Sequence, residues 1–407
     1  MFTQIKGTEM NKYVITLANT CLGCKKPACQ KGCPVQTPIP EMIRLFLAGD
    51  IKKAGQMLFE NNPLSVICSL VCPHEKHCEG HCILNKKGTA VSVGSIENYI
   101  SDLYIHDKHF EKPLKNGHKV AIIGSGPAGI SLAFILAAKG YAITMYDAHD
   151  KIGGVLRYGI PDFRLNKTIL DTLVLKLEEL GVVIRPNITV GKNITVGDLF
   201  RDEFKAVFIG TGVWSPKKLG IKGESLGHVH FAIDYLKNPS VHHLGKKVIV
   251  LGAGNVAMDV ARTAVRNGSQ EVIIMYRKGM EDIPASHHEV ECAKIDGVKF
   301  DLYKQPIEIT DAGVKYRTTD EEQSEGLLEA DSVLIAISQT AKDNIIQGAR
   351  EIEVDGKGLV ITDESGRTTM QGVFASGDVV TGARTVVEAV SFSKRASSAI
   401  EEYIASL

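Results

Sequence analysis

Two kinds of hydrophobic pattern divide the chain near residue 118. Up to about Ser101 no alternation typical of a strand occurs, and apolar residues recur instead at helical spacing. This spacing predicts two short helices, over 38–49 and 50–61. A polar connector, residues 106–118, leads to the second kind of pattern.

From Lys119 onward, short runs of β-branched and apolar residues alternate with helical patterns. This alternation is typical of parallel α/β units. The clearest strands are predicted over 119–123, 142–146, 247–251 and 271–276. A unit of strand, glycine loop, helix and strand occurs twice, at 119–147 and 246–277, so two nucleotide-binding folds are expected.

The composition is that of a globular protein without an excess of either charge. A chain of 407 residues is too long for one ordinary core and suits roughly two to four domains. The 47 Lys and Arg residues balance the 47 Asp and Glu residues, so nucleic-acid binding is not expected. The N-terminus shows no signal pattern, and the most apolar stretch, 130–138, is far shorter than the ~20 residues that span a bilayer. A cytoplasmic protein without a membrane partner is therefore expected.

The first glycine loop has the spacing of a dinucleotide-binding turn. Gly124 permits the tight turn, Gly126 lets the backbone approach a pyrophosphate, and Gly129 lets helix and strand come close. The helix that follows offers free N–H groups and a positive dipole end to the phosphates. Asp147 closes the next strand, where a carboxylate accepts hydrogen bonds from an adenosine ribose. The alternative is a glycine turn without a ligand. The predicted ligands are Gly124, Gly126, Pro127, Ala128, Gly129 and Asp147.

The second glycine loop differs because its second strand is followed by basic residues, Arg277 and Lys278, and not by an acid. An arginine here suits the 2′-phosphate of NADP, which a carboxylate would repel. One charge-assisted hydrogen bond of roughly 1.5–3 kcal/mol would favour NADPH over NADH by roughly ten- to a hundred-fold. NADPH is therefore predicted, with NADH or a merely solvated basic turn as the alternatives. The predicted ligands are Gly252, Gly254, Asn255, Val256, Ala257, Arg277 and Lys278.

Two dinucleotide sites in one chain predict that hydride leaves a nicotinamide and enters a flavin. The first site, with its acid, is the better site for FAD. A further segment, 372–378, predicts a short strand that ends in Gly377 and Asp378, before a helix that starts near Thr385. Asp378 is expected at the ribityl or phosphate groups of FAD, and the start of the helix is expected to favour negative charge on the reduced ring. The FAD-binding domain would then be split in sequence, with the NAD(P)H-binding domain inserted into it.

Eight of the nine cysteines lie in residues 21–82, and Cys292 stands alone. No export signal accompanies this density, so metal binding is favoured over disulfides. Four thiolates suit Zn²⁺ as well as a 4Fe–4S cluster by count, and histidines lie among the cysteines. The two groups are Cys21, Cys24, Cys29 and Cys33, followed by Pro34, and Cys68, Cys72, Cys78 and Cys82, with Pro73 after Cys72.

Two observations favour iron–sulfur clusters over zinc. A cysteine followed by proline is typical of ferredoxin-like runs. The second nucleotide-binding unit contains only Cys292 and hence no redox-active dithiol, which leaves the N-terminal thiols as the destination of the electrons. That destination must accept single electrons from a flavin, and zinc has no redox chemistry.

Together these residues resemble, over nearly the whole chain, the small subunit of bacterial glutamate synthase and its relatives. The relatives include the electron-input half or subunit of dihydropyrimidine dehydrogenase and the large subunit of a bifurcating ferredoxin:NADP transhydrogenase. Two positions depart from the family pattern: Ser338 stands where glycine is usual, and Asn166 where proline is common. The matching segments are the two cysteine groups and residues 153–165, 208–212, 283–285 and 372–390.

The resemblance implies ligands that spacing alone does not supply. One 4Fe–4S cluster would take Cys21, Cys24, Cys29 and Cys82. The other would take Cys33, Cys72, Cys78 and the carboxylate of Glu97, and Cys68 would be left over. A carboxylate is a harder donor than a thiolate and is expected to alter the potential of that cluster. The alternative for Glu97 is an ordinary helix acid. In segment 153–165, Gly154 and Arg157 are implied as FAD contacts.

The expected fold is therefore α/β with an all-α N-terminal Fe–S domain and two interleaved Rossmann-like dinucleotide-binding domains of the glutathione-reductase type. The expected domains are 1–115 for two 4Fe–4S clusters, 116–225 with 341–407 for FAD, and 226–340 for NAD(P)H.

The function that the resemblance implies is an electron-input subunit, which passes electrons from NAD(P)H through FAD and the clusters to a partner. That partner would be the glutamate synthase large subunit or a pyrimidine-reducing FMN/Fe–S subunit. Ferredoxin would be an acceptor if the flavin bifurcates. No side chain is expected to act as a general acid or base.

Overall fold

The structure is a computed structural model that describes residues 7–341, 349 and 351–407. The first six residues of the predicted Fe–S domain, and residues 342–348 and 350 of the predicted FAD-binding domain, lie outside the described residues. The chain divides into two compact units. Unit 1 contains residues 1–154, 164–212 and 343–407, and unit 2 contains residues 155–163 and 213–342.

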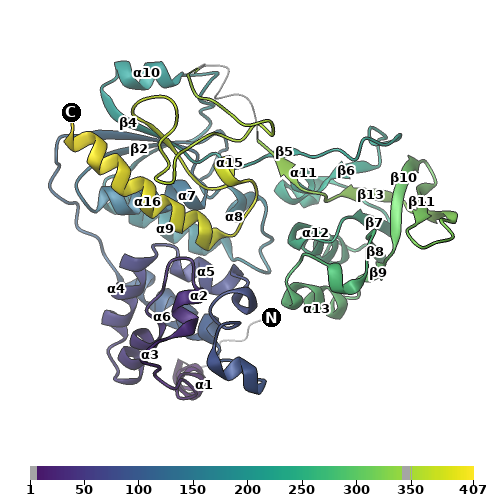
Figure 1. Cartoon of the computed structure of the whole chain (residues 1–407), viewed down its shortest axis with the longest axis horizontal. Coiled ribbons are helices and arrows are strands. Elements are labelled where there is room, and N and C mark those ends of the chain that lie inside the picture. The colour runs from purple at the N-terminus through teal and green to yellow at the C-terminus, as the bar shows by residue number, and fades with distance from the viewer. Residues whose placement is uncertain (1–6, 342–348, 350) are drawn as a thin grey trace. The chain divides into compact units, whose positions relative to one another are not determined.

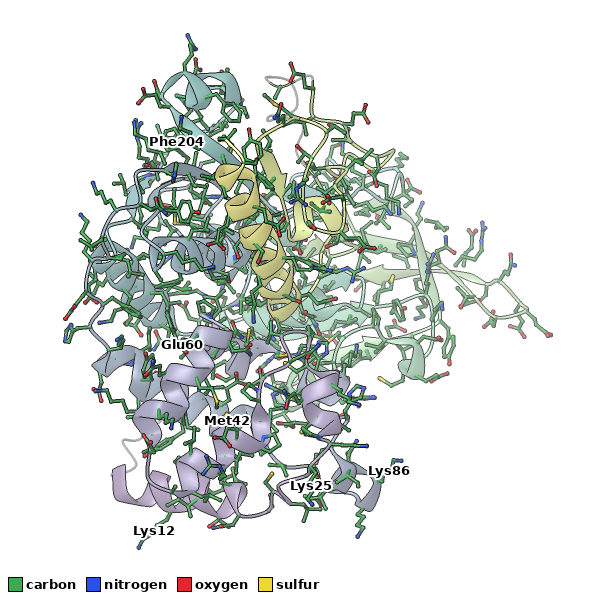
Figure 2. All side chains as sticks on the ribbon, turned by 60° about the vertical axis from the view of Figure 1, so that its left-hand side comes forward. Lys12, Lys25, Met42, Glu60, Lys86 and Phe204 are labelled. Carbon is green, nitrogen blue, oxygen red and sulfur yellow. The ribbon has the colours of Figure 1, made fainter. Side chains whose placement is uncertain are left out.

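The N-terminal part of unit 1 is helical throughout the described residues, as predicted (Figure 1). The predicted helices over 38–49 and 50–61 are confirmed as α3 and α4. Their apolar faces form one core with α1 and α6, around the fully buried Met42, Leu58 and Ile100. Figure 2 shows Met42 inside this helical part. The helices are α1 (Gly7–Ala18), α2 (Ala28–Gly32), α3 (Ile39–Leu47), α4 (Ile51–Asn61), α5 (Ser65–Val71), η1 (His74–Lys76), η2 (Ile83–Lys87) and α6 (Val93–Asp107).

The rest of unit 1 is built on a five-stranded parallel sheet with strand order β15-β4-β1-β2-β3. Its strands are apolar in consecutive positions because parallel sheets are covered on both faces. Helices α7 and α16 pack along one another over this domain (Figure 1). The elements are β1 (Lys119–Ile123), α7 (Pro127–Ala137), β2 (Ala142–Tyr146), α9 (Lys167–Glu179), β3 (Val183–Arg185), α10 (Val196–Arg201), β4 (Phe204–Ile209), β15 (Val373–Ala375), α15 (Asp378–Thr381) and α16 (Val386–Ala405).

Unit 2 repeats the design with a parallel sheet of order β6-β13-β7-β8-β9, beside an antiparallel meander of β10, β11 and β12. Helices α11, α12 and α13 contribute to its core. The elements are α8 (Val155–Tyr158), β5 (Ser215–Pro216), β6 (Val229–Phe231), α11 (Ala232–Lys237), η3 (Pro239–Val241), β7 (Lys247–Leu251), α12 (Asn255–Arg266), β8 (Glu271–Met275), η4 (Met280–Asp282), α13 (His287–Ile295), β9 (Lys299–Asp301), β10 (Lys304–Thr310), β11 (Gly313–Thr318), β12 (Glu325–Glu329), β13 (Ser332–Ile335) and β14 (Gln339–Thr340).

The four clearest predicted strands are present as β1, β2, β7 and β8, and β15 returns to the first sheet after the inserted unit. The limits of the units differ from the predicted limits. Residues 213–225, grouped above with the FAD-binding domain, belong to unit 2, because β5 pairs with β14 there. Within the described residues, no helix combines the length and the apolar character needed to cross a membrane.

Candidate functional site

The first glycine loop joins β1 to α7 in a conformation that only glycine adopts without strain. Gly124 has a φ of +94°, and a Cβ there would lie 2.6 Å from the carbonyl oxygen of Gly210. A Cβ on Gly129 would lie 2.0 Å from the carbonyl oxygen of Gly124. At Gly126, by contrast, no heavy atom lies closer than 3.9 Å to such a Cβ. Two glycines therefore permit the fold, whereas Gly126 leaves space in front of the backbone.

The start of α7 leaves its own N–H groups to a ligand. Gly126 is the N-cap, no side chain caps the helix, Pro127 occupies the first turn, and that turn contains no acid. The first N–H groups of a helix have no partner within the helix and bind anions such as phosphate. Ala128 lies 3.1 Å from a Cβ placed on Gly377, so the segments 124–129 and 377–378 meet here.

The Asp147 carboxylate lies at the end of β2 and is held by four donors. One oxygen accepts from the backbone N–H and hydroxyl of Ser125, and the other from the backbone N–H and Nδ1 of His149. Although burial alone would raise the pKa of Asp147, these hydrogen bonds hold it below its usual value. Asp147 is therefore an ionised acceptor beside the loop.

Gly154 and Arg157, which the resemblance implies as FAD contacts, fall in different units. Gly154 has a φ of +52°, and a Cβ there would lie 2.7 Å from the Cα of Gly126, so its backbone touches the first loop. Arg157 lies on α8, which belongs to unit 2.

Gly377 and Asp378 follow β15 beside the same loop. Gly377 has a φ of +77°, and the Asp378 carboxylate accepts from the backbone N–H of Arg384 at 3.1 Å. Burial raises the pKa of Asp378 to about 6, and the neighbouring Glu388 contributes in the same direction. Asp378 therefore changes its charge close to neutral pH.

Thr385 is the N-cap of α16 and forms a capping box with Glu388. The backbone N–H and the hydroxyl of Thr385 donate to Glu388 Oε2, the latter at 2.6 Å. Although burial opposes ionisation, these hydrogen bonds lower the pKa of Glu388. A carboxylate thus stands in the first turn of α16, which reduces the positive potential expected there.

The second glycine loop, between β7 and α12, has the same backbone plan. Gly252 has a φ of +118°, and a Cβ there would lie 2.5 Å from the carbonyl oxygen of Ala336. Around Gly254, no heavy atom lies within 4 Å of such a Cβ. Gly254 is also the N-cap of α12, which has no side-chain cap and no acid in its first turn.

Other residues of the second loop hold it in place. Asn255 accepts from the backbone N–H of Ser286 at 2.9 Å, Val256 is partly buried against the core of unit 2, and Ala257 is fully buried. The side chain of Asn255 thereby links the loop to the start of α13.

Arg277 and Lys278 follow β8, the strand adjacent to β7, and both side chains are exposed. Lys278 lies 3.6 Å from Asp282. Within the described part of the chain, the Arg277 guanidinium makes no ion pair, and its backbone carbonyl accepts from Thr319 Oγ1. A cation without a carboxylate partner is thus available near the second loop.

The four cysteines implied for the first cluster surround one hollow. Cys21, Cys24, Cys29 and Cys82 all line a cavity of about 410 Å³ at the end of the helical part of unit 1. Burial raises the pKa of the Cys29 thiol to about 11, and the three other thiols contribute to this shift. The four residues therefore line the same cavity.

The residues implied for the second cluster form a more deeply buried group. Burial raises the pKa values of Cys72 and Cys78 far above the usual range, and Cys33 and Glu97 contribute to both shifts. Burial also raises the pKa of Glu97 to about 8. Within the described residues, the carboxylate of Glu97 has no hydrogen bond or ion pair. A buried carboxylate that lacks a partner is costly, and coordination of a metal would satisfy it.

Cys68, which the spacing groups with Cys72 and Cys78 but the resemblance leaves over, lies in the same buried group. Its pKa is raised mainly by burial, with contributions from Glu97 and Cys33. The second group thus offers one sulfur more than the implied ligand set. Among the described residues, no three His, Cys, Asp or Glu side chains stand close enough together to hold a single metal ion.

Two family models match the chain. The family model described as pyridine nucleotide-disulphide oxidoreductase matches residues 118–392. The model described as dihydropyrimidine dehydrogenase domain II, 4Fe–4S cluster, matches residues 1–109. Both nucleotide-binding units and the helical part are therefore covered by family models.

Two curated relatives align over nearly the whole chain. The glutamate synthase [NADPH] small chain of Azospirillum brasilense is 34% identical, over 99% of this chain and 91% of the relative. The NAD-dependent dihydropyrimidine dehydrogenase subunit PreT of Escherichia coli (strain K12) is 31% identical, over 95% of this chain and 93% of the relative.

Solved structures share the fold of the nucleotide-binding part. Thioredoxin reductase from T. acidophilum has a TM-score of 0.58 at 22% identity, over 70% of this chain and 97% of that chain. Mycobacterium tuberculosis FprA in complex with NADPH has a TM-score of 0.61 at 18% identity, over 71% of this chain and 85% of that chain.

Proposed function

The chain belongs to the pyridine nucleotide-disulphide oxidoreductase family and carries an N-terminal 4Fe–4S domain, and we propose that it feeds electrons from NADPH to a larger catalytic subunit. The observation that carries this proposal is the combination of two nucleotide-binding folds with the cluster domain in one chain, which the full-length relatives share. The chain is accordingly an NAD(P)H-dependent flavin and iron–sulfur oxidoreductase.

When bound, FAD would supply a hydride acceptor for NAD(P)H, and the 4Fe–4S clusters would supply one-electron transfer. The residues bind and orient these groups. The loop 124–129 and the start of α7 would hold the FAD pyrophosphate, with Asp147 at the ribose and Gly154 against the loop. Asp378 would face the polar groups of the flavin chain, and Arg157 and Thr385 remain proposed contacts.

The loop 252–257 would hold the NADPH pyrophosphate at the start of α12. Arg277, with Lys278, would bind the 2′-phosphate, because its guanidinium is exposed next to the loop and has no carboxylate partner within the described residues. The exposed position supports the preference for NADPH that the sequence predicts.

The thiols and Glu97 would hold two clusters in the sets given by the resemblance. Two four-iron clusters require about eight iron and eight sulfide per chain. The variant Cys24→Ser should reduce the iron content to about four, whereas Cys292→Ser, outside the N-terminal groups, should leave about eight. Equal iron content in both variants would contradict the assignment of Cys24.

The proposed partner is the large subunit of a glutamate synthase, since the small chains of that enzyme are among the full-length relatives. A pyrimidine-reducing subunit is the second candidate for the partner. The length of the alignment with PreT favours this candidate. The match to the glutamate synthase small chain extends over 443 positions, although this chain has 407 residues, whereas the match to PreT extends over 393. Insertions therefore separate the chain from the first relative more than from the second.

Co-purification of the native complex decides between the two candidates. The complex is expected to convert 2-oxoglutarate and glutamine to glutamate with NADPH. Reduction of uracil or thymine in its place would assign the second candidate. A complex that performs neither reaction while its flavin is reduced by NADPH would contradict both partners.

A further inference from the structure

The surface around the first cysteine group is basic. Lys26 and Lys86 line the cavity together with Cys21, Cys24, Cys29 and Cys82. Lys25 directly precedes Lys26 in the chain, and Lys87 directly follows Lys86. All four lysines are exposed. Figure 2 shows Lys25 and Lys86 at the periphery of the helical part, away from the labelled Lys12. We call Lys25, Lys26, Lys86 and Lys87 the lysine rim.

The two chain segments that carry the lysine rim are free of acidic residues in the sequence. Residues 21–40 and 80–96, which carry the rim, contain no Asp or Glu. Within the part of the chain that the structure describes, none of the four lysines forms an ion pair. Four cations without partners on two adjoining loops produce a local positive field, although the whole chain has a net charge of zero.

Two large apolar side chains are exposed on the same loops. Leu22 follows Cys21 and is 63% exposed, and Ile83 follows Cys82 and is 56% exposed. Apolar side chains surrounded by charged ones are typical of protein-binding surfaces, in which an apolar centre is bordered by a polar rim.

The other end of the helical part is already covered within unit 1. The hydroxyl of Ser391 on α16 donates to the carbonyl oxygen of Pro34 at 3.0 Å, and Lys394 on α16 donates to Asn61 at 2.9 Å. The first of these contacts adjoins Cys33, which the resemblance assigns to the second cluster. The residues implied for the second cluster thus lie toward the FAD-binding domain, whereas those implied for the first cluster line a cavity at the surface.

We propose that the lysine rim, with Leu22 and Ile83, docks an acidic face of the electron-accepting partner protein over the first cluster. This inference rests on the proposed function and adds the charge and the site of the partner's contact surface. Complementary charge steers association and fixes orientation, and redox complexes of this kind bury little area. An acidic face is required because a basic or neutral one would leave four cations unpaired.

The test measures binding to a named probe, an acidic plant-type ferredoxin, by the holoprotein. The double variant Lys25→Glu/Lys86→Glu should bind the probe at least about tenfold more weakly than the wild type at low ionic strength. The matched control Lys12→Glu, an exposed lysine on α1, should bind like the wild type. Raising the ionic strength from roughly 0.02 M to 0.2 M should weaken wild-type binding and narrow the difference between the variants, because salt screens exposed charges.

Two outcomes would overturn the proposal. One is equal affinity of the double variant and the wild type, or an equal loss in Lys12→Glu. The other is wild-type binding of a basic probe, cytochrome c, as tightly as the ferredoxin. Iron content and NADPH-dependent reduction of ferricyanide, measured on the same samples, separate these outcomes from a failure of the proposed function. If the iron content and the reduction of ferricyanide are normal while the double variant binds the ferredoxin like the wild type, the docking surface is rejected and the proposed function is not.

Discussion

The pKa values of Asp147 and Asp378, two carboxylates near the first glycine loop, are shifted in opposite directions. Four donors lower the pKa of Asp147 although it is buried, whereas burial raises the pKa of Asp378 to about 6. Asp147 is therefore charged at every physiological pH and suited to accept from ribose hydroxyls. Asp378 is charged mainly above about pH 6.

The raised pKa of Asp378 predicts a dependence of stability on pH. The folded-state pKa of about 6 exceeds the unfolded value, so the contribution of Asp378 is fully present below about pH 4 and is lost as pH rises through 6. The loss amounts to about 2–3 kcal/mol by pH 7. In the Asp378→Asn variant this loss should disappear, so the wild type should weaken relative to the variant between pH 4 and pH 7. Parallel curves of unfolding free energy against pH for the two proteins would show that burial does not raise the pKa of Asp378.

Arg277 is exposed, and its guanidinium makes no ion pair with any residue that the structure describes, so it is the proposed contact of the NADPH 2′-phosphate. Replacing it with alanine should raise the Michaelis constant for NADPH by roughly ten- to a hundred-fold and leave that for NADH nearly unchanged. Arg317→Ala is a suitable control, because Arg317 pairs with Glu325 in the meander of the same unit. Steady-state kinetics with both nucleotides measure the effect. An equal rise for NADPH and NADH would mean that Arg277 does not bind the phosphate.

At the scale of single residues, the sequence predicted the positions of the loop glycines and Asp147 better than the side chains that contact them. The glycines and Asp147 stand where the spacing placed them, since a glycine loop requires a positive φ at fixed positions. Ser338, where the family usually has glycine, has a φ of +106°, which explains that usage. The partnership of Ser125 and His149 with Asp147, and the position of Cys68, depend on tertiary contacts and could not be derived from spacing.

The two strand–loop–helix elements differ in what each glycine does. Gly124, Gly129 and Gly252 are required by the fold, because a Cβ would collide with backbone atoms. Gly126 and Gly254 have ordinary φ values and open surroundings, so the fold does not require their small size. Short apolar runs in the sequence revealed the strands of these elements, because strands in parallel sheets are apolar at consecutive positions.

The open surroundings of Gly254 lead to a test at the level of the element. The variant Gly254→Ala should unfold at the same temperature as the wild type within a degree or so, yet bind NADPH at least about tenfold more weakly, because the methyl group would occupy the place of the pyrophosphate. Gly227→Ala is the matched control in the same unit, since a Cβ there also meets no atom within 4 Å. Differential calorimetry and a nucleotide titration measure the two effects. If both variants bind NADPH equally well, the loop does not hold the pyrophosphate.

The start of α16 shows where a general rule about helices was insufficient. A bare helix N-terminus favours negative charge, but Thr385 and Glu388 already form a capping box there. The Thr-x-x-Glu pattern was present in the sequence and indicates such a box.

For the whole molecule, the resemblance to glutamate synthase small subunits is confirmed by full-length relatives and by family models for both parts of the chain. The split sheet, with β15 returning after unit 2, was predicted from one short motif. The unit limits were displaced, because β5 and β14 pair with each other and neither carries a sequence signal. The backbone form of the two glycine loops was predictable, whereas the cavity lined by Cys21, Cys24, Cys29 and Cys82 required the structure.

The central claim is that one chain takes hydride from NADPH and delivers single electrons to iron–sulfur clusters. Anaerobic titration of the reconstituted chain with NADPH, followed by visible absorbance and electron paramagnetic resonance, tests it most directly. The account predicts that flavin absorbance is bleached and that a paramagnetic signal from reduced clusters appears in the same sample. The claim would be contradicted if NADPH bleached the flavin but produced no paramagnetic signal from the clusters, while a strong chemical reductant did produce that signal.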